Sequence, residues 1–154
     1  MAGAIKFEMK LSGVKSAIRA IEDIGYTMKP ADLRDMVRYA IKVAEGPAQS
    51  AAPRGTEPHM VKSKGARWPV IPPYAATQIK VKAKVFKDKT GARAMLGVRQ
   101  PAFYATSFVE LGTDKMDARP WLGPAFTSAA PAMLQRMKTW LQRKLKRVKK
   151  RMAK

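Results

Sequence analysis

The longest amphipathic stretch of the sequence lies at its C-terminal end and places the strongest limit on the fold. Apolar residues recur there at steps of three, four and occasionally seven, which predicts a helix with one buried face: Phe126, Ala129 or Ala130, Met133, Met137, Trp140 or Leu141, Leu145, Val148 and Met152. Pro131 predicts a kink, or a restart with Ser128 as the cap. At ~1.5 Å per residue, a helix from Ser128 to Lys154 is roughly 40 Å long, so part of it is expected to project toward another molecule.

The charge of the chain is strongly positive and unevenly placed. Lys and Arg number 31 against 11 Asp and Glu, a net charge of +20, and the stretch from Ala118 to Lys154 holds eleven basic residues and no acidic one. A charged face is often merely solvated, but this excess is larger than solubility requires and predicts an anionic partner, either DNA or an acidic protein. The candidate contacts are Lys80, Lys82, Lys84, Arg143, Lys144, Arg147, Lys150 and Arg151.

The first fifty residues are expected to form one strand and two helices. Apolar and charged residues alternate over 4–11, which predicts a strand with one buried face. Three- and four-residue steps follow Ser12 and predict a helix that ends at Gly25. A second helix is predicted from Pro30, with Gly46 and Pro47 ending or kinking it.

The segment 53–73 has no usable periodicity and contains five prolines, which predicts a long basic loop. Arg67 and Trp68 in this loop are candidate contacts for a protein partner, because Arg and Trp often anchor interfaces. Trp68 covering a small core of the loop itself is an equally good interpretation. His59, which has no second ligand at metal-binding spacing, is interpreted as an ordinary loop residue.

The middle of the sequence predicts antiparallel strands. Apolar residues and lysines alternate over 79–85, turn residues follow at 88–91, and the alternation resumes over 94–98, which together predict a β-hairpin. The aromatic run 103–111 is expected to add a third antiparallel strand. The predicted fold is α+β in one domain, 1–154: an antiparallel sheet of about four strands packed with two N-terminal helices, plus a long basic amphipathic helix at about 120–154.

Catalytic chemistry is poorly represented in this sequence. It has one histidine, no cysteine and scattered carboxylates, so no enzyme, metal, cofactor or small-molecule site is expected. Glu110 lies inside an apolar run and is interpreted as an outward-facing residue or a partner of Arg119. No signal-peptide core and no apolar run of about 20 residues is present, so a soluble protein made in a cytoplasm, without a membrane partner, is expected.

The stretch FVELGTDKMDARPWLGPAF, Phe108 to Phe126, carries a recognisable motif. Its pattern of aromatic-Val-Glu-apolar-Gly-Thr, a Lys-Met pair, and Ala-Arg-Pro-aromatic-Leu-x-Pro-Ala resembles the signature of the tail-completion, or head–tail joining, proteins of long-tailed double-stranded-DNA phages. The resemblance carries over to Phe108, Glu110, Gly112, Thr113, Arg119, Pro120, Trp121, Leu122 and Pro124 as the family motif. Arg119 and Trp121 are the candidates for contacts between subunits, with a purely core role as the alternative for Trp121. The long insert after Ala52-Pro53 departs from the family pattern.

The resemblance implies a structural role without catalysis. It implies a small α+β subunit whose copies form a ring, usually hexameric, at the neck of the virion, between the tail tube and the head connector. The implied partners are further copies of the chain, the head connector or stopper, and the tail terminator or tail tube, with non-specific DNA contact as an added possibility. The implied location is the virion, after assembly in the host cytoplasm. Two alternatives stay open: a tail terminator that caps the tube, and a basic nucleic-acid-binding protein.

Overall fold

The computed structural model describes residues 14–23, 25–55, 57–63, 65–71, 74–89, 91–99 and 102–153. Their elements follow in the order α1 (Val14–Glu22), α2 (Pro30–Ile41), the 3-10 helix η1 (Lys42–Ala44), α3 (Glu45–Ala51), β1 (His59–Ser63), β2 (Ala66–Val70), α4 (Tyr74–Thr77), β3 (Ile79–Val85), β4 (Ala92–Val98), α5 (Ala102–Leu111) and α6 (Leu122–Met152). The chain therefore mixes helices and strands, as predicted. The strand expected over 4–11 lies outside the described residues.

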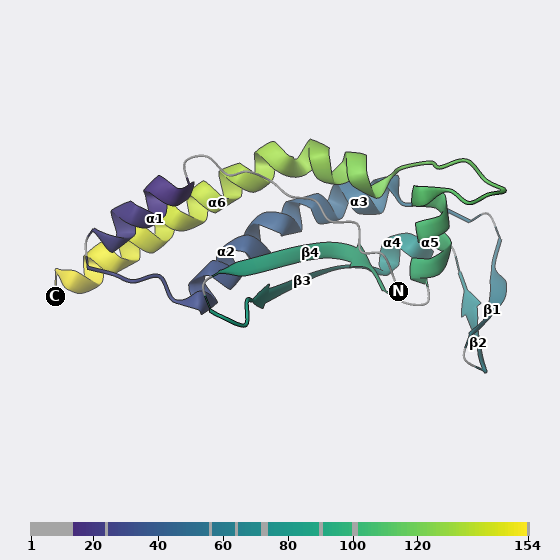
Figure 1. Ribbon diagram of the computed structural model, residues 1–154, viewed down its shortest axis with the longest axis horizontal. Helices are drawn as coiled ribbons and strands as arrows, with labels where there is room; N and C mark the ends of the chain where they lie inside the picture. Colours follow the sequence, from purple (N-terminus) through teal and green to yellow (C-terminus); the bar gives the residue numbers. More distant parts are fainter. Residues whose placement is uncertain are drawn as a thin grey trace.

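The body of the molecule has three layers (Figure 1). Helix α6, with α1 beside it, forms one outer layer, and the β3–β4 hairpin forms the other. The row α2–η1–α3 lies between them and contacts both. A core cluster fills the space around the middle layer, with Met36 and Ile41 from α2 meeting Met133, Met137 and Leu141 from α6. The amphipathic stripe of the C-terminal helix is thus buried within the chain.

The middle row shows how proline and glycine shape a long helical segment. The helix predicted from Pro30 is interrupted a few residues before Gly46 and Pro47, by the 3-10 turn Lys42–Ala44, whereas Gly46 and Pro47 themselves lie inside α3. Proline at the third residue of α3 is tolerated because N–H groups in the first turn of a helix have no partner inside it. Ala44 and Ala48 are fully buried here, so the small residues allow close packing of α3 against α6.

Helix α6 continues without interruption from Leu122 to Met152, so the alternative of a restart at Ser128 is wrong. Pro131 lies inside it and cannot donate a hydrogen bond to the carbonyl of Thr127. Both residues are exposed, so water can bond to that carbonyl in place of a backbone N–H. The far end of α6 does not project freely either, because Val148 is buried and α1 packs alongside.

The predicted hairpin is confirmed as β3 and β4, whose antiparallel register pairs Ile79 with Val98 and Val85 with Ala92. The described residues do not form a single sheet of about four strands. The described strands form two separate two-stranded sheets, β1–β2 and β3–β4. The run expected to be a third strand is helix α5 instead, in which Ala102, Thr106 and Glu110 recur at four-residue steps and are all buried. A short apolar run does not distinguish a strand from a helix by periodicity, and here the buried face has helical spacing.

The segment expected to be a loop, 53–73, contains the β1–β2 hairpin (Figure 1). Its register pairs His59 with Val70 and Trp68 with Val61, with a turn at Gly65. Pro69 lies within β2 opposite Met60. Each strand of a two-stranded sheet has a free edge, and a proline whose nitrogen faces that edge removes no ladder hydrogen bond. The five prolines therefore did not prevent strand formation.

Candidate assembly site at the joint between α5 and α6

The motif from Phe108 to Phe126 forms the joint between α5 and α6, and Glu110 is its central side chain. Glu110 is 7% exposed and belongs to the last turn of α5. Its carboxylate accepts hydrogen bonds from three consecutive backbone N–H groups at the start of α6: Trp121 at 2.6 Å, Leu122 at 2.9 Å and Gly123 at 3.0 Å. Both interpretations of Glu110 from the sequence are therefore wrong: the side chain does not face outward, and its partners are backbone N–H groups rather than Arg119.

These bonds satisfy the start of α6 completely. The first four N–H groups of a helix have no acceptor inside it, and here they belong to residues 121 to 124. Glu110 takes the first three, and Pro124 has no N–H to satisfy. The next donor, Ala125, already bonds to the carbonyl of Trp121 within the helix. The negative carboxylate also faces the positive end of the helix dipole, so one side chain caps a 31-residue helix from another element.

The loop between the two helices is held by backbone contacts. Gly112 donates to the Phe108 carbonyl at 2.8 Å and ends α5, and Thr113 pairs with Met116 in an isolated bridge. The Arg119 backbone N–H then donates to the Val109 carbonyl at 2.7 Å. Gly112 has φ +74°, a conformation that glycine adopts without steric cost. Most of the motif therefore has a structural role at the joint.

One exposed side of helix α5 is apolar. Phe108 is 53% exposed and Leu111 62%, and both lie on the same face of α5 as exposed Ala105. We call Ala105, Phe108 and Leu111 the α5 apolar face. Large apolar side chains that gather on one surface usually mark a contact with another molecule.

The remaining motif residues divide between surface and core. Thr113, Arg119, Pro120 and Pro124 are exposed, whereas Leu122 is buried. Trp121 is 7% exposed and packs in a second core cluster with Ala48, Ala52, Ile79, Leu122 and Ala125, which fits its core interpretation. Its indole Nε1 has no hydrogen-bond partner among the described residues. Pro120 precedes α6 rather than forming its first turn, because the helix begins at Leu122.

The candidate contacts in the 53–73 segment lie on strand β2. Arg67 is exposed and is paired in register with Lys62, and Trp68 occupies the next position of the strand. Neither interpretation of Trp68 is tested by this placement.

The basic residues singled out in the sequence fall on two different surfaces. Lys80, Lys82 and Lys84 lie on the exposed side of β3, and Arg93 is directly opposite Lys84 on β4. Arg143, Arg147, Lys150 and Arg151 are exposed on α6. Lys144 differs from all of these, because it is committed to an ion pair inside the chain.

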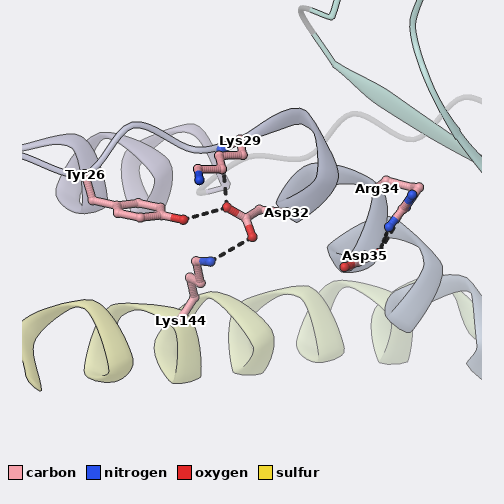
Figure 2. Close-up of polar contacts among 6 residues, drawn as sticks. All are labelled: Tyr26, Lys29, Asp32, Arg34, Asp35 and Lys144. Carbon is pink, nitrogen blue, oxygen red and sulfur yellow. Dashed lines mark hydrogen bonds and ion pairs between the residues drawn. The ribbon is translucent and has the colours of Figure 1, made fainter. Parts of the chain in front are cut away.

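The ion pair of Lys144 belongs to a polar cluster between α6 and the start of α2 (Figure 2). Lys144 Nζ lies 2.7 Å from Asp32 Oδ1, while the Tyr26 hydroxyl donates to Asp32 Oδ2 at 2.8 Å and the Lys29 backbone N–H donates to the same oxygen at 3.3 Å. Lys144 Nζ also lies 4.9 Å from the centre of the Tyr26 ring, within the range of a cation–π contact. The cluster ties the C-terminal helix to the N-terminal part of the chain.

The cluster changes the pKa of both charged groups. Burial alone would raise the pKa of Asp32, but the hydrogen bonds from Lys144 and Tyr26 outweigh burial and hold that pKa below its usual value. Burial alone would lower the pKa of Lys144, and the hydrogen bond to Asp32 outweighs it and raises that pKa. Both shifts favour the charged forms, so the pair stabilises the folded chain near neutral pH.

Replacing Asp32 by asparagine is expected to lower the free energy of unfolding by roughly 1–3 kcal/mol near pH 7, because the hydrogen bonds lose their charged acceptor. The difference from the wild type should shrink below about pH 4, because Asp32 becomes protonated as the pH falls through its lowered pKa in the folded chain. It should also shrink above about pH 10, because Lys144 loses its proton as the pH rises through its raised pKa in the folded chain. Urea unfolding across pH measures this. Asp35→Asn is the control: its side chain and that of Arg34 are 52% and 44% exposed, so about 0.5 kcal/mol or less is expected. A difference between Asp32→Asn and the wild type that does not change with pH would contradict the assignment.

Sequence reasoning found the motif but missed the outward position of Leu111 and the capping role of Glu110. The spacing of three residues between Ala105, Phe108 and Leu111 is the signal that could have shown a helical face. Within the described part of the chain, no three His, Cys, Asp or Glu side chains gather where they could hold a metal ion, and no helix has the length and apolar character to cross a membrane. Comparison of the chain with known protein families, with curated proteins and with solved structures gives no match.

Proposed function

We propose that the chain is a structural subunit of the neck of a long-tailed double-stranded-DNA phage, a tail-completion or head–tail joining protein whose copies form a ring between the tail tube and the head connector. The motif from Phe108 to Ala125 supports the family. The observation that carries the proposal is the α5 apolar face, which lies on the motif itself and is exposed in the single chain.

The α5 apolar face fits a contact between copies. Helix α5 has one charged side chain, Glu110, and that side chain is buried against α6. The outward face therefore has no charge of its own to keep it in water. Because the contacts described above fix α5 at the start of α6, the apolar face is presented by a rigid joint, and a preformed surface binds with less loss of conformational entropy.

Removing the apolar side chains from this face is expected to prevent assembly. We expect the wild-type protein to form rings in native mass spectrometry and electron microscopy, and the double variant Phe108→Ser/Leu111→Ser to be monomeric with an unchanged circular dichroism spectrum. Met95→Ser/Met152→Ser removes two other exposed apolar side chains and is expected to leave the rings intact. A wild-type protein that is monomeric at tens of micromolar would contradict the ring.

Deletion of the gene tests the position of the ring in the particle. Phage that lack the protein are expected to accumulate filled heads and separate, unjoined tails. Tails of abnormal length in the deletion would instead indicate the alternative, a terminator that caps the tail tube. Normal infectious virions would contradict both roles.

A further inference from the structure

The outer surface of α6 carries a dense group of cations that the proposed function does not use. Helix α6 contains nine Lys and Arg residues and no Asp or Glu. Two of the nine have partners within the chain: Lys144 pairs with Asp32, and Arg136 lies 5.2 Å from the centre of the Tyr39 ring. The other seven are all exposed, and we call them the α6 cationic surface: Lys138, Arg143, Lys146, Arg147, Lys149, Lys150 and Arg151.

These seven cations repel one another in the isolated chain. Arg143 and Arg147, Lys146 and Lys150, and Arg147 and Arg151 are each four residues apart, so their side chains are neighbours on the helix, and each like-charged pair costs roughly 0.2–0.5 kcal/mol. The ion pairs formed among the described residues involve none of the seven. Lys149, Lys150 and Arg151 gain some stabilisation from the negative end of the helix dipole. A bound polyanion would relieve the remaining repulsion.

We propose that the α6 cationic surface binds the phosphate backbone of duplex nucleic acid. Six of its cations lie between Arg143 and Arg151, over about 12 Å of helix at ~1.5 Å per residue, which is about one positive charge per 2 Å. Duplex DNA carries about one negative charge per 1.7 Å of its axis. The two charge densities match, and both are arranged along a rod.

Other partners fit this surface less well. An amphipathic helix binds a membrane through an apolar face, but the apolar face of α6, including Met133, Met137 and Leu141, is buried in the core. The centre of a protein interface is depleted of charged residues and rich in apolar ones, whereas the one large apolar side chain that the described part of α6 exposes is Met152, at its end. A second copy that placed its own α6 against this surface would bring like charges together.

The binding is expected to be independent of sequence. Lysine and arginine on an exposed helix face can reach phosphates without entering a groove, and phosphate contacts position a protein without reading bases. This inference does not depend on the neck function, because the surface is complete in a single chain.

The test is fluorescence anisotropy of a labelled duplex DNA of arbitrary sequence, about 30 base pairs long, titrated with the full-length protein at rising salt. Arg143→Gln/Arg147→Gln/Lys150→Gln removes three charges from α6. Lys80→Gln/Lys82→Gln/Lys84→Gln is the matched control, because it removes three charges from the hairpin on the other side of α2 (Figure 1). Circular dichroism checks that both variants fold.

We expect the α6 variant to bind DNA at least about tenfold more weakly at low salt. The slope of the logarithm of its association constant against the logarithm of the salt concentration should be shallower by up to about 2.7, which corresponds to the loss of three phosphate contacts. The hairpin variant should stay within about threefold of the wild type. Equal losses in both variants would overturn the assignment to α6, as would no binding by the wild type. Equally tight binding of polyglutamate would overturn the assignment to nucleic acid. Rings that fail to form while DNA still binds through α6 would contradict the neck function alone.

Discussion

Replacing Glu110 by alanine is expected to lower the free energy of unfolding by roughly 3–5 kcal/mol, the largest effect of any single substitution considered. The change leaves the N–H groups of Trp121, Leu122 and Gly123 without an acceptor at a buried helix start. Hydrogen bonds to a charged group contribute about 1.5–3 kcal/mol each, and water that enters the space restores part of the loss. Urea unfolding at neutral pH measures the difference.

Two variants separate the cap from a general effect of charge. Glu45→Ala removes another glutamate from the first turn of a helix, but Glu45 is only half-buried and makes no such cap, so about 0.5 kcal/mol is expected from the helix dipole alone. Glu110→Gln keeps one acceptor oxygen and should fall between alanine and the wild type. An alanine variant as stable as Glu45→Ala would show that the N–H groups find other acceptors.

Periodicity predicted the elements whose two faces have different environments. The hairpin formed by β3 and β4 has one face on α2 and lysines on the other, and α6 has one face in the core, so each has a clear pattern in the sequence. Helix α5 buries Thr106 and Glu110 together with Ala102 and exposes Phe108 and Leu111. The usual pattern of a surface helix, apolar toward the core and polar toward water, is therefore missing, and the segment was wrongly interpreted as a strand.

The β1–β2 hairpin was missed for another reason. Its described contacts are mainly between its own two strands, and its sequence has no alternation of apolar and polar residues. Without that alternation, the prolines dominated the interpretation. Only the register, with Pro69 opposite Met60, shows that proline and strand coexist there.

The motif located the candidate site, but the sequence did not show what each residue does. The partners of Glu110 lie eleven to thirteen positions further along the chain, and only the folded loop brings them together. The same holds for charge. Sequence alone counted Lys144 among the cations available to a partner, whereas Asp32, 112 residues earlier, neutralises it in the fold. Pairing of this kind is a property of the tertiary structure.

Replacing Gly112 by alanine is expected to lower the free energy of unfolding by roughly 2–4 kcal/mol. The residue has φ +74°, and left-handed backbone costs a non-glycine residue about 1–2 kcal/mol. A Cβ atom would also lie 2.8 Å from the backbone nitrogen of Ala118 and 2.9 Å from the carbonyl oxygen of Met116. Those atoms belong to the loop that places Arg119 against Val109, so they cannot move without disturbing the joint.

Gly46→Ala provides a control of opposite sign in the same measurement. Gly46 lies inside helix α3, is exposed, and has no neighbouring atom within 4 Å of an added Cβ. Alanine there restricts the unfolded chain and suits the helix, so the free energy of unfolding should rise by about 0.5–1 kcal/mol. A Gly112→Ala variant that is at least as stable as the wild type would show that the joint between α5 and α6 is not the rigid element described here. A loss confined to Gly112→Ala, together with loss of ring assembly, would tie the geometry of the joint to the α5 apolar face that it presents.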